Sequence, residues 1–473
     1  MKVCLFCEGC YPYIPGGVSG WVQMLTSQFS DIEFSIVSIA TSREEMSEYA
    51  YTLPPNVTSV QTLYLADHVF SGKGRKLHLN SQERQVLQSL FGREEFTNWQ
   101  ALLELISKYR SHLTDLLMSE EFYEAALLEY KEQKQEKPFF SYLWNCRSMY
   151  FPFLSVLSFD IPEADIYHSV STGYAGIMGS DASFIKKRPF VLTEHGIYTR
   201  EREEDIIRSN WVDSDFKENW IRFFKKLSLT AYGQAERVIT LFGVNRSLQI
   251  ELGCPAEKIE IIPNGVDTAS FENLPCKNKL SHEGVMLGAV LRVVPIKDVK
   301  TMLLAFAWAQ KQIPSLGLCI MGNQHEDESY FKDCRQMVET LDLKNVIFAG
   351  QVQIKEYLPE IDILLLSSIS EGQPLSILEG LAAGIPYIST NVGDCGRLLC
   401  GDGENDLEQA GIIVPVMDSE AMGNAIIQLA SAPDLRRNMG EAGRKRVNRF
   451  YQKADFLARY YQMYQELCAK GGS

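Results

Sequence analysis

The sequence predicts an α/β protein made of two doubly wound, Rossmann-like lobes that face a central cleft, with a helical insertion in the first lobe. Short apolar runs alternate with helical periodicity along most of the 473 residues, which is typical of parallel sheets covered by helices on both faces. The length also exceeds what one ordinary core requires. Between about Ala66 and Tyr150 the strand-like runs stop and long helical stretches replace them, so the insertion is expected there.

The first lobe is expected to span residues 1–270. It begins with the apolar run Val3–Glu8, a loop that holds Gly16 and Gly17, and a helix, which together form a strand, glycine turn and helix unit. Its other strands are expected at the apolar runs Phe34–Ile39, Ile166–His168, Phe190–Thr193, Val238–Leu241 and Ile259–Ile262.

The second lobe is expected over residues 280–449, after a linker at about Pro263–Gly284 where turn residues dominate. The remaining stretch, 450–473, predicts an amphipathic helix that packs back on the first lobe. Strands of the second lobe are expected at Met286–Leu291, Leu316–Met321, Val346–Phe348, Ile363–Leu366, Tyr387–Ser389 and Ile412–Val414.

Composition excludes several classes of protein. Hydrophobic residues make up 45% and charged residues 22% of the chain, so a folded globular protein is expected rather than a disordered one. A formal net charge of −14 argues against a nucleic-acid surface, which needs clustered Lys and Arg. The sequence shows no signal peptide and no run long enough to cross a bilayer. A cytoplasmic location is therefore expected, with contact to the inner membrane only through partners.

The 11 cysteines are expected as reduced thiols, mostly in the core. Cys4, Cys7 and Cys10 form the one cluster with metal-like spacing, and they would need a fourth ligand from elsewhere. Because Cys4 and Cys7 fall in one strand and point to different faces, a structural role is favoured over a metal site.

The strongest chemical signal is the segment SEGQPLSILEG, which contains Glu371 and Glu379. Glu371 is expected in a loop at the carboxyl end of the strand Ile363–Leu366, and Glu379 in the helix that follows. A helix N-terminus at such a loop offers backbone N–H groups to a phosphate, and a carboxylate further along can accept both hydroxyls of a ribose. The alternative is a pair of solvated helix glutamates.

Cations and glycines follow two other strands. Arg292 and Lys297 come after the strand that begins at Met286, where they could neutralise a diphosphate leaving group in place of a metal ion, or act as ordinary surface cations. Gly16 and Gly17 would let the backbone approach a phosphate or a sugar, or simply form a tight turn.

Two histidines and two charged clusters have weaker cases. His195 and His168 belong to strand ends that face a ligand crevice in doubly wound sheets, although a lone histidine is more often structural. The triplet Asp213, Ser214 and Asp215 resembles a metal motif, but it precedes a helix, so capping is favoured. Arg200 and Arg202 are expected to pair with the neighbouring glutamates, which are Glu201, Glu203 and Glu204.

With these residues in place, the chain resembles glycosyltransferase family 4 and, within it, the PelF group of bacterial Pel-type exopolysaccharide synthesis. The motifs that carry the resemblance are YPYIPGGVSGWV, TEHGIYTRERE, IIPNGVD, GAVLRVVPIKD and SEGQPLSILEG. The resemblance implies the two-lobed GT-B fold, retention of anomeric configuration, a UDP-sugar donor such as UDP-glucose, no cofactor and no catalytic metal. It also implies a saccharide acceptor and a membrane-bound polysaccharide synthase complex as partners.

The family's site residues map onto this sequence as follows. Arg292 and Lys297 would hold the diphosphate, Glu379 the ribose hydroxyls, Glu371 and His195 the donor sugar, and Gly17 the region of the phosphates. Glu371, His195, Arg292 and Lys297 would be catalytic. The whole donor site would comprise Gly16, Gly17, Arg292, Lys297, Glu371, Gly372, Gln373, Pro374, Leu375, Ser376 and Glu379.

The sequence departs from the commoner family pattern at Gln373 and Pro374, where many relatives have Phe and Gly, and this affects the expected contacts to the donor sugar. Two other functions fit the same architecture. One is a UDP-sugar epimerase, which would need an acid and base pair of carboxylates that the sequence does not show. The other is a non-catalytic UDP-sugar-binding component of a membrane synthase.

Overall fold

The computed structural model describes ten stretches of the chain, and parts of the expected insertion and linker lie outside them. The chain divides into two compact units, the first of Met1–Ile261 with Tyr460–Ser473 and the second of Ile262–Arg459. The described stretches are 1–44, 48–67, 77–92, 98–110, 113–132, 137–209, 211–275, 279–280, 282–401 and 408–471.

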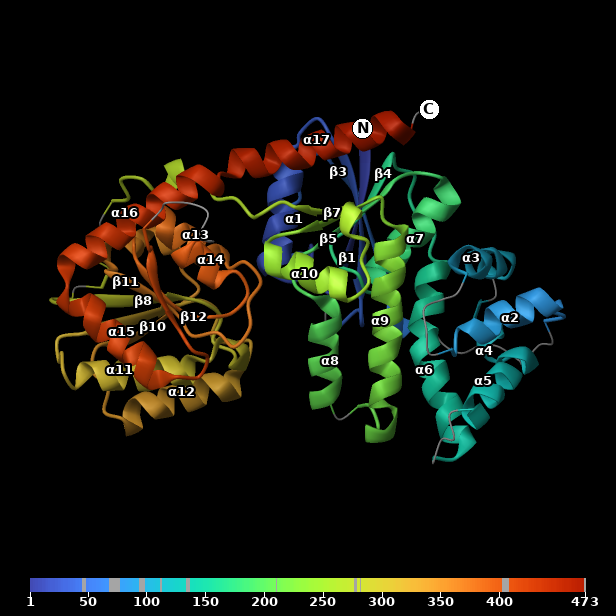
Figure 1. Cartoon of the computed structure of the whole chain (residues 1–473), viewed down its shortest axis with the longest axis horizontal. Coiled ribbons are helices and arrows are strands. Elements are labelled where there is room, and N and C mark those ends of the chain that lie inside the picture. Colours follow the sequence, from blue (N-terminus) through green and yellow to red (C-terminus); the bar gives the residue numbers. More distant parts are fainter. Residues whose placement is uncertain are drawn as a thin grey trace. The chain divides into compact units, whose positions relative to one another are not determined.

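A parallel seven-stranded sheet forms the centre of the first unit, in the order β3-β2-β1-β4-β5-β6-β7 (Figure 1). The expected α/β class is confirmed. Its strands contain runs of buried apolar residues such as Val3–Cys7 and Phe190–Leu192, because helices cover both faces of a parallel sheet. The strands are β1 (Lys2–Glu8), β2 (Glu33–Ala40), β3 (Val57–Tyr64), β4 (Ile166–Ser169), β5 (Phe190–Glu194), β6 (Arg237–Thr240) and β7 (Ile259–Ile261).

The sequence analysis missed β3. This strand reads VTSVQTLY, pairs only with β2 at the edge of the sheet, and leaves most of its side chains partly exposed. Polar residues therefore interrupt its apolar positions, so no apolar run marks it.

The helices of the first unit pack in two layers. α7 packs against α9 on one face of the sheet, and Trp21 of α1 contacts Tyr460 of α17 on the other, with ring centroids 5.3 Å apart. The helices are α1 (Gly17–Gln28), α2 (Ser81–Ser89), α3 (Trp99–Lys108), α4 (Leu113–Leu117), α5 (Glu120–Glu132), α6 (Phe139–Ser158), α7 (Tyr174–Lys186), α8 (Tyr198–Arg208), α9 (Lys217–Gln234), α10 (Gly243–Glu251) and α17 (Lys453–Gly471).

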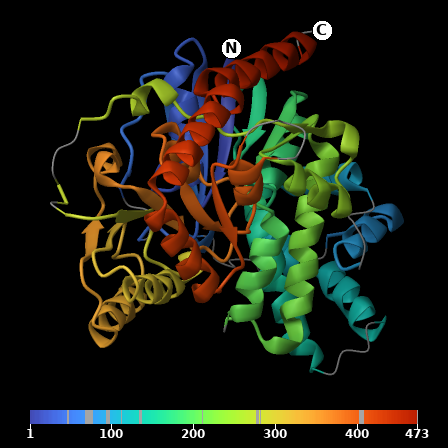
Figure 2. The same cartoon turned by 60° about the vertical axis from the view of Figure 1, so that its left-hand side comes forward.

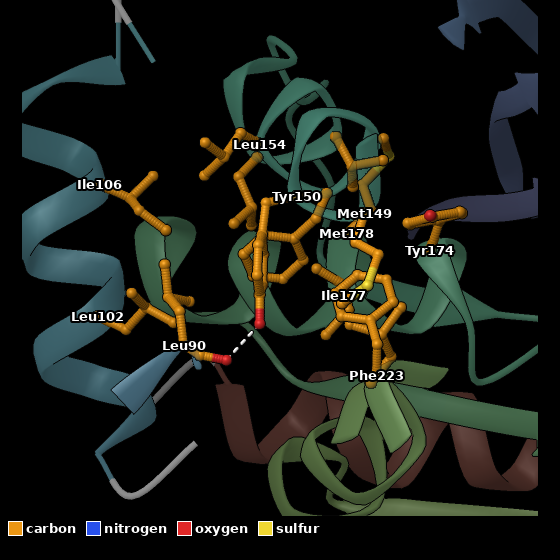
Figure 3. Close-up of a cluster of buried hydrophobic side chains, with 14 of the residues drawn as sticks. Leu90, Leu102, Ile106, Met149, Tyr150, Leu154, Tyr174, Ile177, Met178 and Phe223 are labelled. Atoms are coloured by element: carbon orange, nitrogen blue, oxygen red, sulfur yellow. Dashed lines mark hydrogen bonds between the residues drawn. The ribbon is translucent and has the colours of Figure 1, made fainter. Parts of the chain in front are cut away.

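Helices α2 to α6 lie between β3 and β4, where the helical insertion is expected. They share one core with the sheet through α6, α7 and α9 (Figure 3). Leu102 of α3, Tyr150 of α6 and Phe223 of α9 are buried in this cluster, and the Tyr150 hydroxyl donates a hydrogen bond to the backbone oxygen of Leu90. Each such side chain stabilises the fold by about 1.5–3 kcal/mol through burial, so the insertion is part of the first unit rather than an appendage.

The C-terminal helix α17 returns to the first unit from Tyr460 onward. This part of α17 lies beside the N-terminal segment of the chain in both views (Figures 1 and 2). The Tyr461 hydroxyl donates to Asp31 at 2.5 Å, and Arg237 pairs with Glu466 at 2.5 Å. The end of the chain is thereby attached to the same unit as its beginning.

The second unit has a parallel six-stranded sheet in the order β10-β9-β8-β11-β12-β13. Its strands are β8 (Met286–Val290), β9 (Gly317–Met321), β10 (Val346–Gly350), β11 (Ile363–Leu366), β12 (Tyr387–Thr390) and β13 (Gly411–Val414). α11 and α15 pack together, as do α13 and α16 (Figure 1). The helices are α11 (Val299–Gln310), α12 (Glu328–Thr340), α13 (Leu375–Ala382), α14 (Cys395–Cys400), α15 (Ser419–Ser431) and α16 (Pro433–Phe450).

In each sheet the strand order reverses beside the first strand, between β1 and β4 and between β8 and β11. Ligands of open α/β sheets bind outside the carboxyl ends of the strands at such a reversal. The segments after β1, β4, β8 and β11 are therefore the places to look for a site. Across the described stretches, no helix combines the length and the apolar character needed to cross a membrane.

Candidate functional site

The reversal point of the second sheet brings two predicted site residues into direct contact. Lys297 follows β8 at the end of a short 3-10 helix, Pro295–Lys297, and Glu371 follows β11. The Lys297 Nζ atom lies 2.6 Å from Glu371 Oε1, and the two side chains are only 16% and 10% exposed. An ion pair this well shielded from water is screened less than a surface pair, so it fixes both side chains at the carboxyl edge of the sheet.

Hydrogen bonds hold the two loops that carry this pair. The backbone N–H of Ile369 donates to Ile296 O at 2.9 Å, and the Ser367 hydroxyl donates to Lys297 O at 2.8 Å. Ser368 Oγ donates to Glu371 Oε1 at 2.5 Å, so one carboxylate oxygen receives both the ammonium and a hydroxyl. The loop after β8 and the loop after β11 therefore form one rigid frame around Lys297 and Glu371.

A glycine that the sequence analysis missed completes this frame. Gly393, after β12, has φ +53°, and a Cβ there would collide with the backbone oxygens of Glu371 and Gly372. Glycine adopts this left-handed backbone without strain, and only glycine permits so close an approach of the two backbones. A glycine shortly after an apolar strand is a signal the sequence contains, but nothing in the sequence shows that its neighbour is the loop of Glu371.

Arg292 does not join the Lys297–Glu371 pair. Its guanidinium pairs with Glu326, which follows β9, and the two side chains are 47% and 41% exposed. An exposed pair of this kind contributes about 0–1 kcal/mol, so an anionic ligand can displace Glu326 at little cost. The structure thus separates the two expected phosphate cations into a shielded one and an exposed one.

Gln373 is buried and hydrogen-bonded within the protein. Its Nε2 donates to Asp394 Oδ2 at 2.7 Å, and its Oε1 accepts the backbone N–H of Asn264 at 2.6 Å. The residue that departs from the commoner family pattern therefore supports the loop between β11 and α13. Its expected contact with a donor stays a prediction.

The N-terminus of α13 lies directly after this loop. Pro374 is its N-cap residue and provides no side-chain hydrogen bond, so no side chain caps the N–H groups of the first turn, which includes Leu375 and Ser376. Such a helix end carries partial positive charge and suits a phosphate. The shielded cation, the carboxylate and this helix end all belong to the carboxyl edge of one sheet.

Glu379 lies in α13, as expected, and it is half-buried. Burial raises the pKa of its carboxyl to about 7, and Lys355 opposes this shift. The folded chain therefore keeps this proton to a higher pH than the unfolded chain, so the contribution of Glu379 to stability falls as pH rises from about 4.5 to about 7. A ligand whose hydroxyls donate hydrogen bonds to the ionised Glu379 carboxylate would stabilise that form. Binding would then reverse the cost of ionising the buried carboxyl.

We expect uridine to bind about tenfold more weakly at pH 6 than at pH 8, because a single carboxyl with a pKa near 7 changes from mostly neutral to mostly ionised over that range. Uridine is the better probe, since it carries no phosphate that titrates in the same window. Calorimetric titration of the wild type and of Glu379→Gln checks this. The variant should bind with no pH dependence, and an unchanged slope in the variant would assign the titration to another group.

In the first unit, Gly16 and Gly17 open α1 after β1, and a Cβ at either position would meet no atom within 4 Å. Both glycines are exposed, and Gly16 has an extended backbone with φ 173°. The backbone there is accessible to a ligand, but no close packing requires glycine. The expected phosphate or sugar contact stays a prediction.

His195 follows β5 and its ring lies 4.9 Å from that of Trp21, edge to face. Burial lowers the pKa of His195 to about 4, so the ring is neutral at physiological pH. Its Nε2 atom is buried and has no hydrogen-bond partner among the described residues. A neutral imidazole with an unsatisfied nitrogen can hydrogen-bond a ligand, but it cannot balance a charge.

His168 is structural. Its Nδ1 lies 2.6 Å from the Tyr464 hydroxyl and its Nε2 lies 2.8 Å from Thr193 Oγ1, so both ring nitrogens are engaged. Burial lowers the pKa of His168 to about 3. This histidine attaches α17 to the sheet.

Glu194 lies at the carboxyl edge of the first sheet, next to His195, and the sequence analysis overlooked it. It is buried, and its carboxylate accepts hydrogen bonds from the Tyr232 hydroxyl at 2.6 Å and Gln249 Nε2 at 2.7 Å, and from the backbone N–H of Tyr198 at 3.1 Å. Burial raises the pKa of Glu194. The signal in the sequence was an acidic residue at the end of an apolar strand. The role of Glu194 is to order the start of α8.

The weaker clusters have structural explanations. Asp213 caps a 3-10 helix by accepting the N–H of Asp215 at 3.1 Å, so the capping interpretation is confirmed. Arg202 forms an ion pair with Asp205 at 3.4 Å, one helical turn away, while of the expected glutamates Glu201 also interacts with its charge. In the described part of the chain, no group of three or more His, Cys, Asp and Glu side chains is arranged to hold a metal ion.

Comparison with known proteins agrees with this architecture. Residues 270–446 match the model described as "Glycosyl transferases group 1". The sheet of the second unit lies within these matched residues, and the two doubly wound parallel sheets have the GT-B fold. Residues 1–257 match the model described as "Domain of unknown function (DUF3492)", and the chain therefore belongs to that family.

Two curated relatives illustrate the similarity. The chain is 33% identical over 179 residues to the putative glycosyltransferase EpsD of Bacillus subtilis, which is 37% of this chain and 44% of the relative. It is 26% identical over 274 residues to the amylovoran biosynthesis glycosyltransferase AmsK of Erwinia amylovora, which is 56% of this chain and 61% of the relative. The chain thus spans about half the length of these relatives.

Solved structures share the fold over nearly the whole chain. The sucrose-phosphate synthase of Thermosynechococcus elongatus has a TM-score of 0.61 at 16% identity and covers 99% of both chains. The structure of Anabaena HepE in complex with UDP-glucose has a TM-score of 0.60 at 15% identity and covers 98% of this chain and 100% of its own. At these identities the similarity demonstrates the fold and leaves the reaction to be argued from the site.

Proposed function

We propose that this protein is a retaining, metal-independent glycosyltransferase that moves a hexose, from UDP-glucose, to a growing exopolysaccharide in Pel-type synthesis. The observation that carries the proposal is the shielded contact between Lys297 and Glu371 at the reversal point of the second sheet. A cation beside a carboxylate, next to a helix N-terminus, provides one group for a departing diphosphate and one for the positive charge that develops on a sugar.

The donor would be held along the carboxyl edge of the second sheet. Lys297 and Arg292 would neutralise the diphosphate with help from the N–H groups at the start of α13, and Glu379 would accept the ribose hydroxyls. Glu371 would lie at the donor sugar. The positions of these residues support the proposed roles, since the cations follow β8 while both glutamates follow β11.

His195 and Gly17 belong to the first unit, and we propose that they contact the donor as well. The unsatisfied Nε2 of His195 supports a hydrogen bond to a sugar hydroxyl. The open backbone at Gly17 supports an approach by phosphate oxygens.

Transfer would proceed on one face of the sugar. The bond from the anomeric carbon to the diphosphate oxygen breaks as the acceptor oxygen bonds to the same face, and the acceptor proton moves to the departing phosphate oxygen. No separate general base is needed. Exclusion of water would protect the donor from hydrolysis, while Lys297 would balance the charge that appears on UDP.

The relatives support the polymer context. EpsD and AmsK are named as glycosyltransferases, AmsK for amylovoran biosynthesis, and the HepE structure contains UDP-glucose. We extend these properties to this chain as a proposal, including a saccharide acceptor and association with a membrane-bound synthase.

We expect UDP to protect the protein against thermal unfolding, by about 5–10 °C at a hundredfold excess over its Kd, because a ligand that binds only the folded state stabilises it by mass action. Differential scanning fluorimetry with UDP, UDP-glucose, GDP and ADP at matched concentrations is the measurement. UDP-glucose should protect at least as well as UDP. Equal or greater protection by GDP would contradict the uridine assignment.

A further inference from the structure

A groove on the first unit has no role in the donor site described above. It is lined by eight residues of α1, of the turn after it and of the segment before β3, and its volume is about 590 Å³. This is within the range of ligand pockets, about 300–1,000 Å³. The lining residues are Gln23, Ser27, Ser30, Thr52, Leu53, Pro54, Pro55 and Asn56.

None of the eight lining residues is ionisable, although charged residues make up 22% of this chain. The groove presents hydroxyl and amide groups together with the apolar faces of Leu53 and two prolines. Recognition of a nucleotide or of a uronate polymer would require cations, which the lining lacks. Uncharged polar groups beside apolar faces fit a neutral saccharide, which has hydroxyls along its edges and C–H groups on its faces.

Both walls of the groove are held in place by the protein. Gln23 Nε2 donates to Thr52 O at 3.0 Å at one end. At the other end, Asn56 Nδ2 donates to the backbone oxygens of Thr26, Phe29 and Ile32 at 2.8–3.0 Å, which fastens the segment to the end of α1. The groove between these attachments is therefore preformed, which lowers the entropic cost of binding.

Tyr51, which directly precedes the lining residue Thr52, connects this segment to the glycine loop. The Tyr51 ring packs on Tyr11 with centroids 5.5 Å apart, and its hydroxyl accepts the Gly16 N–H at 3.4 Å. Nearby, the half-exposed Tyr49 meets Tyr13 edge to face at 5.3 Å. The exposed ring of Tyr49 offers a flat surface with a polar edge, which suits a sugar ring.

We propose that this groove binds a neutral stretch of saccharide chain, remote from the reacting end of that chain. Identification of this saccharide as the acceptor rests on the proposed function, whereas the binding itself does not. The groove would let the enzyme hold a polymer rather than a single sugar.

The test measures binding of maltohexaose, cellohexaose and chitohexaose by saturation-transfer NMR and calorimetry, with a hexauronate as the charged comparison. Ser27→Trp and Ser30→Trp fill the groove from exposed positions. We expect at least one neutral hexasaccharide to bind the wild type, and each variant to weaken that binding by at least about tenfold, or about 1.4 kcal/mol. The hexauronate should not bind.

Gln28→Trp is the matched control, because Gln28 is exposed on the same helix next to Ser27 but does not line the groove. It should bind the hexasaccharide like the wild type, and all three variants should bind UDP like the wild type. Absence of binding by every neutral hexasaccharide, or equal binding to the filled variants, would overturn the proposal. Saccharide binding without any UDP binding would instead support the proposed saccharide groove and refute the proposed transferase activity.

Discussion

Replacing Glu371 by Gln is expected to lower kcat by about a hundredfold or more, while the Kd for UDP stays within about threefold of the wild-type value. The substitution keeps the shape of the side chain and removes the charge that would stabilise a developing positive sugar. It also releases Lys297, whose ammonium lies 2.6 Å from Glu371 Oε1. A released ammonium can still bind phosphate, so UDP affinity has no reason to fall.

The measurement combines steady-state kinetics with UDP-glucose and calorimetric titration with UDP. Asp333→Asn is the matched control, since Asp333 also pairs with a lysine, Lys300, at 2.8 Å, but on the exposed surface of α11 and α12. The control should retain wild-type kcat. A Glu371→Gln enzyme with full activity would remove Glu371 from the reaction.

Replacing Lys297 by Ala is expected to weaken UDP binding by about ten- to a hundredfold, or about 1.4–2.7 kcal/mol, and to leave uridine binding within about twofold. The interaction that the proposal assigns to Lys297 is with phosphate charge, and the ammonium is only 16% exposed, so water would screen that interaction weakly. Arg292→Ala should have the same direction and a smaller effect, because the Arg292 side chain is 47% exposed and already paired with Glu326.

Lys300→Ala serves as the control for both cation variants, because Lys300 is a cation of the same unit that is 40% exposed and paired with Asp333. It should bind UDP and uridine like the wild type. An equal loss of UDP and uridine in Lys297→Ala would place Lys297 away from the phosphates. A larger loss of UDP affinity in Arg292→Ala than in Lys297→Ala would make Arg292, and not Lys297, the more important cation for UDP binding.

The sequence was sufficient for the parts of the fold that are buried on both faces. Strand β11 is apolar throughout, and β1 and β5 contain the buried apolar runs Val3–Cys7 and Phe190–Leu192; burial alone makes such runs recognisable. The edge strand β3 was missed because its partial exposure allows polar residues along it.

The positions of the candidate residues in the fold could be predicted from the sequence, but the contacts between them could not. Lys297 and Glu371 were each expected at a strand end, yet their hydrogen-bonded contact depends on which strands are neighbours, and β8 meets β11 only through the reversal of strand order. Two other contacts could not be predicted for the same reason, the ion pair of Arg292 with Glu326 and the hydrogen bond of Gln373 to Asp394. Long-range neighbours come from topology, which one-dimensional patterns do not specify.

The raised pKa of Glu379 is likewise a property of packing. The sequence placed this glutamate in a helix, but only the folded unit shows the burial that raises its pKa to about 7. The pH dependence of uridine binding therefore tests a feature that the motif alone could not suggest.

The most direct test of the central claim follows radiolabelled glucose from UDP-glucose in the presence of excess EDTA and a panel of saccharide acceptors. The account predicts that label moves from the nucleotide into a saccharide with retained anomeric configuration, and that Mg²⁺ adds nothing, because in the proposed site Lys297 and Arg292 would balance the diphosphate. Loss of transfer in EDTA with recovery in Mg²⁺ would contradict the metal-independent site. Label that stays in the nucleotide-sugar pool, as an epimer or as unchanged UDP-glucose, would contradict the transferase itself.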